Sequence, residues 1–105
     1  MAIVDVTIMP LGAGTTSVSD VVAEVHRLLE RSELAIHYQL TPMSTILEGE
    51  VEDLYTILKQ IQEVPFNLGH QRVAMNIRID ERRDKASSMK SKLATVNKKL
   101  RDGAE

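Results

Sequence analysis

The sequence contains no cysteine and no tryptophan, and only two tyrosines and one phenylalanine. The absence of cysteine excludes disulfide bonds, thiolate metal ligands and a cysteine nucleophile. No apolar run approaches the roughly 20 residues that a membrane-spanning helix requires. The first ten residues lack a basic segment and are interrupted by Asp5, so they are not typical of a signal peptide. We therefore expect a cytoplasmic protein.

The chain of 105 residues has the length of one domain, which we expect to span residues 1–105. Its apolar fraction of 43% and its charged fraction of 27% are ordinary for a globular protein. A core of this size that is poor in aromatic side chains buries a modest area. We therefore expect the protein to gain further burial by self-association.

The charges are distributed unevenly along the chain. Residues 1–81 carry five Lys and Arg against twelve Asp and Glu, whereas residues 82–101 carry eight basic residues and a single acid. A basic tail can contact nucleic acid, but this one lacks the interleaved aromatic residues that stack on bases. We expect the tail to meet acidic groups of its own body or of a neighbouring subunit, and we regard nucleic acid as an unlikely partner.

The hydrophobic periodicity predicts four strands and three helices. Alternating apolar residues predict strands over 2–10, 34–40, 44–50 and 72–84. Apolar residues at every third or fourth position predict amphipathic helices over 18–29 and from residue 51 onward. A last helix, over about 86–102, carries a narrow apolar stripe at Met89, Leu93, Val96 and Leu100.

This order, β-α-β-β-α-β followed by a helix, predicts an α+β fold of the ferredoxin-like type. Right-handed crossovers place both helices on one face of a four-stranded antiparallel sheet. The second face is then expected to carry Asp5, Thr7, Met9, His37, Gln39, Asn76 and Arg78, with Thr45 and Leu47 from the third strand. Composition leaves two readings open: this face is solvated, or another subunit covers it and it lines a polar cavity.

The segment "PLGAGTTS", residues 10–17, connects the first strand to a helix N-terminus, where free backbone N–H groups favour anions. It lacks the lysine of a Walker sequence, and Ser17 stands where the third glycine of G-x-G-x-x-G would be. Two readings stay open for this loop. It is either a flexible turn that caps the helix or a loop that touches a ligand.

The sequence offers no clear metal centre or catalytic group. The histidines His26, His37 and His70 are far apart, with no carboxylate at chelating spacing, and we expect His26 on the surface. No nucleophile–base pair is visible, and lone carboxylates such as Asp5 and Asp80 are usually held in salt bridges. We therefore expect a protein that is not an enzyme.

Four segments together carry a family resemblance. They are "IMPLGAGTTSVS" after the first strand, "LTPMSTILEGE" at the hairpin, "RVAMNIRIDERRDK" in the last strand, and the helix behind it. With these segments the chain resembles the small thiamine-binding protein family, ferredoxin-like domains long described as conserved proteins of unknown function. The resemblance runs from Val4 to about Leu100. One departure is Ser44, where glycine is common in the family; its side chain would narrow a pocket or add a hydrogen bond.

The resemblance implies a non-catalytic homodimer or homotetramer that binds thiamine (vitamin B1) or its hydroxymethylpyrimidine moiety. It also implies pockets near the hairpin, a role in the transport or salvage of thiamine precursors, and no cofactor besides the ligand.

The residue types near the hairpin suit such a ligand. An aminopyrimidine offers an amine donor and ring-nitrogen acceptors, so its pocket needs hydroxyl, amide or carboxylate partners and apolar walls. Met43 is a polarizable wall for a flat ring, and Glu48 could accept from the amine or face a thiazolium cation. The candidate ligand-binding residues are Thr7, Ser17, Gln39, Thr41, Met43, Ser44, Thr45, Glu48 and Asn76.

An alternative function remains open at this point. The chain would then be a regulatory or scaffold module that assembles with itself and senses a small anion at the loop from Gly12 to Ser17.

Overall fold

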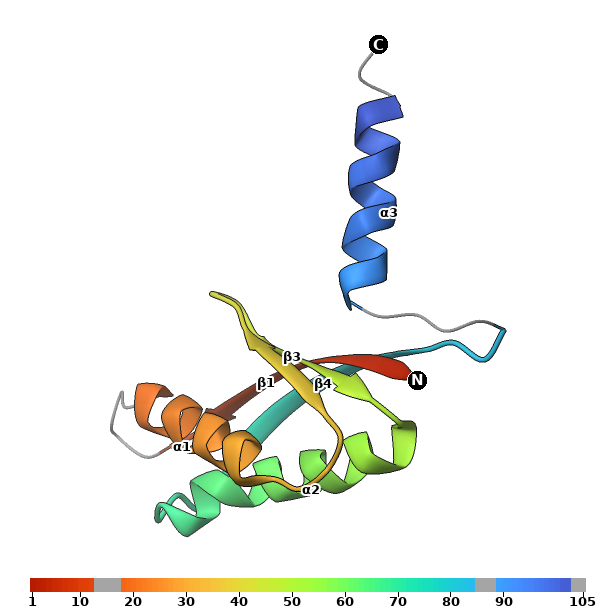
Figure 1. The fold of residues 1–105 in the computed structure, drawn as a ribbon. Helices are drawn as coiled ribbons and strands as arrows, with labels where there is room; N and C mark the ends of the chain where they lie inside the picture. The colour runs from red at the N-terminus through yellow and green to blue at the C-terminus, as the bar shows by residue number, and fades with distance from the viewer. Residues whose placement is uncertain (13–17, 85–88, 103–105) are drawn as a thin grey trace.

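The computed structural model describes residues 1–12, 18–84 and 89–102. In chain order its elements are β1 (Ala2–Pro10), α1 (Val18–Arg31), β2 (His37–Leu40), β3 (Thr45–Gly49), α2 (Val51–Asn67), β4 (Val73–Glu81) and α3 (Met89–Asp102). The four strands form one antiparallel sheet in the order β2-β3-β1-β4. Helices α1 and α2 lie against the same face of this sheet (Figure 1). The predicted ferredoxin-like α+β fold is confirmed.

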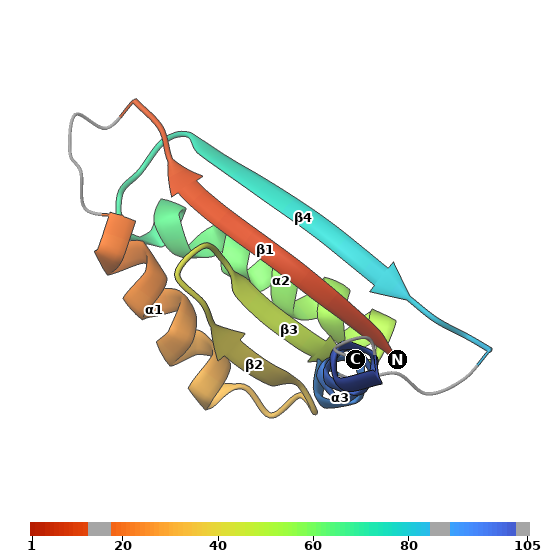
Figure 2. The ribbon, with the colours of Figure 1, turned by 90° about the horizontal axis from the view of Figure 1, so that it is seen from above.

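The core lies between the sheet and these two helices. On α1 the buried residues Val21, Val25 and Leu29 are spaced by four, which places them on one side of the helix. They meet the apolar side of β1, where Val4 and Val6 are buried. Seen from above, α1 lies towards the β2–β3 hairpin and α2 lies beneath the central strands (Figure 2). One end of α1 is thereby brought close to the hairpin.

The register of the hairpin corrects one expectation. Leu40 pairs with Thr45, so four residues connect β2 to β3. Because directly opposed residues in an antiparallel sheet share a face, the pairing of Thr45 with Val6, and of Leu47 with Val4, turns both side chains towards the helices. They are 8% and 0% exposed. Placing Thr45 and Leu47 on the second face was therefore wrong.

The error has a physical origin in the sequence of β3. Ile46 and Leu47 are adjacent apolar residues, so alternation cannot say which of them faces the core. The length of the turn decides the register, and a shift of one residue moves every side chain to the other face. The second face instead receives Ile46 and Glu48, which lie opposite Asp5 and Ile3 of β1.

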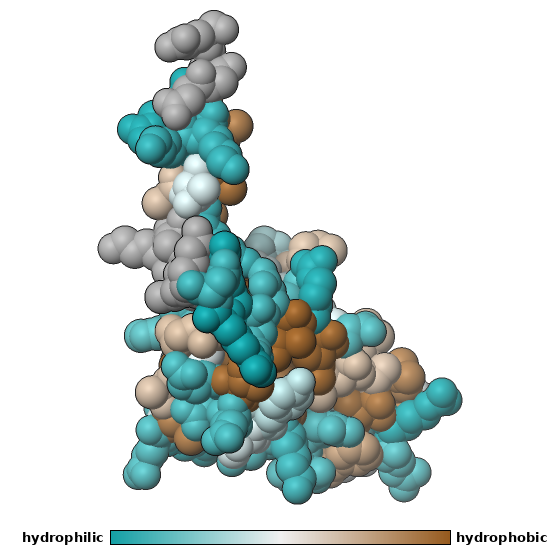
Figure 3. Space-filling view, turned by 90° about the vertical axis from the view of Figure 1, so that its right-hand side faces the viewer, coloured by the Kyte–Doolittle hydropathy of each residue, from teal (hydrophilic) through white to brown (hydrophobic). Residues whose placement is uncertain are grey.

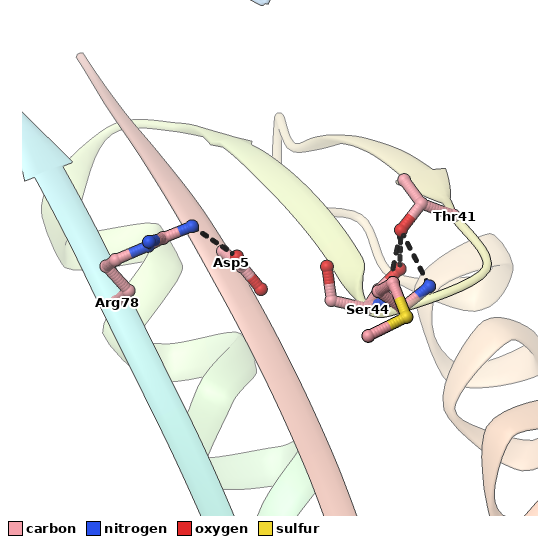
Figure 4. Close-up of polar contacts among 5 residues, drawn as sticks. Asp5, Thr41, Ser44 and Arg78 are labelled. Atoms are coloured by element: carbon pink, nitrogen blue, oxygen red, sulfur yellow. Dashed lines mark hydrogen bonds and ion pairs between the residues drawn. The ribbon is translucent and has the colours of Figure 1, made fainter.

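The second face of the sheet, which α1 and α2 do not cover, carries paired charges. Asp5 and Arg78 are opposed in the β1–β4 ladder, and the Arg78 guanidinium donates to the Asp5 carboxylate at 2.9 Å (Figure 4). Asp80, two residues further along β4, forms an ion pair with Lys92 of α3. The expectation that Asp5 and Asp80 serve in salt bridges is confirmed.

Helix α3 stands away from the layers formed by the sheet and the other helices (Figure 1). Leu93, Val96 and Leu100 are 61%, 52% and 65% exposed, and apolar side chains are visible along one side of the helix (Figure 3). Its own chain therefore leaves these three residues of the predicted apolar stripe uncovered. In the described ranges, no helix combines the length and the apolar character needed to cross the membrane.

Candidate functional site

A pocket of about 730 Å3 opens between α1, the end of β1 and the β2–β3 hairpin. This volume falls within the range of roughly 300–1,000 Å3 typical of small-molecule sites. Its lining consists of Val6, Thr7, Ile8, Met9, Val18, Ser19, Val22, Ala23, Val25, His26, Leu40, Thr41, Pro42, Met43, Ser44 and Thr45. The four residues of the β2–β3 turn, which follow the last paired residue Leu40, all belong to this lining.

The lining is apolar with a few hydroxyl groups. Valine, alanine, leucine, isoleucine, methionine and proline side chains make up most of the wall, and the hydroxyls belong to serine and threonine. Among the described residues of the lining there is no aspartate, glutamate, lysine or arginine, and His26 is the one imidazole. Such a wall favours a ligand part that is uncharged and has a small number of polar atoms, because burying an unpaired charge costs many kcal/mol.

His26 brings a polar group from α1 into this pocket. Its Nε2 atom lies 3.3 Å from the hydroxyl oxygen of Thr45, and its ring meets the ring of Tyr38 edge to face, with centroids 5.7 Å apart. The expectation that His26 lies on the surface was wrong, since the side chain is half-buried and lines the pocket. Its position four residues after Val22, on the same side of α1, was the signal in the sequence.

The hairpin turn is held by the side chain of Thr41. The Thr41 hydroxyl donates to the backbone carbonyl of Ser44 at 2.8 Å and accepts from the backbone N–H groups of Ser44 and Met43 at 3.0 and 3.3 Å (Figure 4). The Thr41 N–H also donates to the Ser44 carbonyl at 2.8 Å. This hydroxyl is therefore engaged in hydrogen bonds within the turn.

The structure divides the predicted site residues into three groups. Five line the pocket: Thr7, Thr41, Met43, Ser44 and Thr45. Three lie on the second face of the sheet by their ladder partners, since Gln39 opposes Ile46, Glu48 opposes Ile3 and Asn76 opposes Thr7. By the same register Thr7 belongs to the second face, although it borders the pocket at the end of β1. Ser17, with most of the 12–17 loop, lies outside the described residues.

Met43 and Thr45 occupy opposite extremes of exposure within the pocket. Met43, at the tip of the turn, is 85% exposed, whereas Thr45 is 8% exposed at the base. A long, polarizable side chain at the rim can fold over a bound ring, while a buried hydroxyl at the base is fixed in place. The pocket thus combines an adaptable edge with a rigid floor.

No cluster of three histidine, aspartate or glutamate side chains is positioned to hold a metal ion in the described parts of the chain. His26 is accompanied there by hydroxyl and apolar groups. The pocket therefore has the donor set of an organic ligand site, made of hydroxyls and an imidazole.

Comparison with known proteins gives a consistent result. The family model described as "Thiamine-binding protein" matches residues 4–97. The UPF0045 protein YqgV of Bacillus subtilis is 54% identical over 102 residues, which cover 95% of this chain and 98% of that protein. A UPF0045 protein of Staphylococcus xylosus is 47% identical over 105 residues, covering 98% of each.

Solved structures share the fold. A hypothetical protein, MJ1052 from Methanocaldococcus jannaschii, superposes with a TM-score of 0.80 at 28% identity and covers 91% of this chain and 95% of its own. A candidate thiamine biosynthesis/salvage protein, TM0486 from Thermotoga maritima, superposes with a TM-score of 0.72 over 90% of this chain and 97% of its own. At 16% identity, the second likeness shows the fold alone.

Proposed function

Because this chain belongs to the thiamine-binding protein family, we propose that it binds thiamine or its hydroxymethylpyrimidine moiety in the pocket between α1 and the β2–β3 hairpin. The observation that carries this proposal is the lining: apolar walls with a buried hydroxyl at the base, in a volume that accommodates a substituted pyrimidine.

The chemistry of an aminopyrimidine matches the polar groups of the pocket. Its exocyclic amine donates and its ring nitrogens accept, whereas a hydroxyl can do both. The hydroxyls of Thr45 and Ser44 meet this need from β3 and the turn, and that of Ser19 meets it from α1. Val22 and Met43 supply apolar surface for the faces of the ring. With no aromatic ring of phenylalanine or tyrosine in the described lining, we expect modest affinity.

The charge of thiamine sets its orientation. The described lining has no carboxylate to neutralise a thiazolium cation, so the cation is better left at the mouth of the pocket, in water. The uncharged pyrimidine then enters first. Hydroxymethylpyrimidine alone should therefore retain most of the affinity of thiamine, and phosphate esters should gain nothing from the pocket itself.

The role is binding without catalysis. The His26 imidazole contacts a threonine hydroxyl, but the described lining holds no carboxylate to orient that imidazole as a general base. A protein that binds a precursor reversibly suits its transport or salvage, and a cytoplasmic location stays a prediction.

We further propose that the chain assembles into a homodimer or homotetramer. The apolar stripe of α3 is exposed at Leu93, Val96 and Leu100, and a second copy of the chain is the simplest surface to cover it. Lysines and arginines flank this stripe, and residues 1–81 carry an excess of acids, so the charges of two copies complement each other. The ion pair between Lys92 and Asp80 supports this pairing of a basic helix with an acidic sheet.

Isothermal titration with thiamine and with hydroxymethylpyrimidine tests the proposal. We expect saturable heat and a rise in melting temperature, because ligand at about 100 times its Kd stabilises the folded state by roughly 2.7 kcal/mol. Thr45→Val should weaken binding about tenfold while remaining folded. The absence of heat and of any melting shift at millimolar ligand would refute the proposal.

A further inference from the structure

The contact between His26 and Thr45 joins two elements across the pocket. His26 belongs to α1 and Thr45 to β3, 19 residues further along the chain, and their side chains meet at 3.3 Å. Both residues line the pocket. In the described lining this is a polar contact between helix and sheet at a base that is otherwise apolar.

Thr45 needs such a partner to present its hydroxyl in one direction. A threonine side chain carries a methyl and a hydroxyl on the same carbon, so a rotation about χ1 exchanges the two. At 8% exposure, a hydroxyl without a partner would cost about 1–3 kcal/mol. The imidazole selects the rotamer in which the oxygen, and not the methyl group, points towards α1 and the pocket.

The imidazole is itself held in place. The Tyr38 ring of β2 contacts it edge to face, with an interplanar angle of 67°. Such pairs contribute roughly 0.5–1.5 kcal/mol beyond the burial of their area. His26 is thus fixed by one residue from each strand of the hairpin, and its nitrogen is delivered to Thr45 by a supported ring.

We propose that His26 is a positioning residue that sets the specificity of the pocket through Thr45. The imidazole Nε2 either donates to or accepts from the Thr45 hydroxyl. In both cases the hydroxyl keeps a lone pair for a donor on the ligand, and when Nε2 donates it also keeps its proton for an acceptor on the ligand. The ligand class is an uncharged, flat nitrogen heterocycle that carries an amine beside a ring nitrogen, because such an edge offers a donor and an acceptor side by side. This inference rests on the proposed function.

A double-mutant cycle tests the proposal. The variants are His26→Phe, which keeps a ring against Tyr38 but removes the nitrogen, Thr45→Val, and the two combined. The probe is hydroxymethylpyrimidine, titrated calorimetrically, and the melting temperature of each free variant is measured in parallel. If His26 acts through Thr45, each single change should weaken binding by about tenfold, and the combined change should cost no more than one of them.

A second pair of variants covers the case in which His26→Phe does not fold. His26→Gln retains a polar group that can reach Thr45, whereas His26→Leu does not. We expect the glutamine variant to bind within about threefold of the parent and the leucine variant to lose about tenfold.

The outcomes separate the two proposals. If the parent protein binds the probe but the effects of His26→Phe and Thr45→Val multiply to about a hundredfold loss, His26 acts independently of Thr45, and this inference is overturned while the proposed function stands. Equal losses in the glutamine and leucine variants overturn it as well. If the parent protein does not bind the probe, both proposals fall together.

Discussion

Val6 of β1 and Thr45 of β3 oppose each other in the sheet, and this pairing turns the Thr45 hydroxyl towards α1. A shift of one residue in the β1–β3 ladder would have placed that hydroxyl on the second face of the sheet, beside the ion pair of Asp5 and Arg78. The register therefore decides which side of the sheet holds the candidate pocket.

Removal of the Thr41 hydroxyl should loosen the hairpin. Thr41→Val keeps the shape of the side chain but removes one donated and two accepted hydrogen bonds within the turn. We expect a loss of about 1–3 kcal/mol in the free energy of unfolding, measured by urea denaturation, and weaker ligand binding. The matched control is Thr56→Val, whose hydroxyl donates to the Glu52 carbonyl on an exposed helix surface and which should change stability by less than about 0.5 kcal/mol. Equal losses in both variants would contradict the assigned role of Thr41.

A larger side chain on the pocket wall should block the ligand. Ala23 of α1 is half-buried and lines the pocket, so Ala23→Leu extends into the space that a pyrimidine ring would occupy. We expect the titration heat to disappear while the melting temperature of the free protein changes little. Ala74→Leu is the control, because Ala74 is exposed on β4 and points away from α1 and α2. Normal binding by Ala23→Leu would mean that the ligand lies elsewhere.

Loss of the ion pair on the second face should have little effect on stability or on ligand affinity. Arg78→Ala removes the partner of Asp5, but the arginine side chain is 85% exposed. Exposed pairs contribute about 0–1 kcal/mol, so the urea midpoint should fall only slightly and ligand affinity should be unchanged. A clear loss of affinity in this variant would instead place the ligand on the second face, with Gln39 and Asn76.

The stripe on α3 should govern assembly. Val96→Asp places a charge in the middle of the exposed apolar surface of Leu93 and Leu100. We expect native mass spectrometry of the parent protein to show a dimer or tetramer, and the variant to shift to smaller species with the body still folded. Asn97→Asp introduces the same carboxylate beside the stripe and should leave the assembly intact. A parent protein that is monomeric at micromolar concentration would refute this proposal.

The strand and helix pattern was strong enough for the fold to be predicted from the sequence. In β1, apolar Val4, Val6 and Ile8 alternate with Asp5 and Thr7, and in α1 the spacing of buried valines is regular, so the element type and the packed face were both predictable. Alternation failed at Ile46 and Leu47, where two neighbours are apolar. Only the pairing of β3 with β1 and β2 resolves them.

The candidate site was predictable in part, and for a similar reason. Residues near one another in the chain, such as Met43, Ser44 and Thr45, were predicted to lie together at the hairpin, and they border the same pocket. The contribution of His26 depends on the docking of α1 beside the turn, a contact between segments 19 residues apart. The helical spacing places His26 on the same side of α1 as Val22, but it does not show that this side meets the hairpin. The engagement of Thr41 likewise depends on the path of the turn backbone, which its residue types leave open.

The location of the ligand is tested most directly by a titration followed by amide NMR. Isotope-labelled protein is titrated with hydroxymethylpyrimidine, and the shift of each backbone N–H signal is mapped onto the structure. We predict saturable changes at Val22, Ala23, Ser44 and Thr45 around the pocket, with little change at Arg78. The proposed ligand site between α1 and the hairpin would be contradicted by changes concentrated at Asp5, Asn76 and Arg78 on the second face, or by no changes at millimolar ligand.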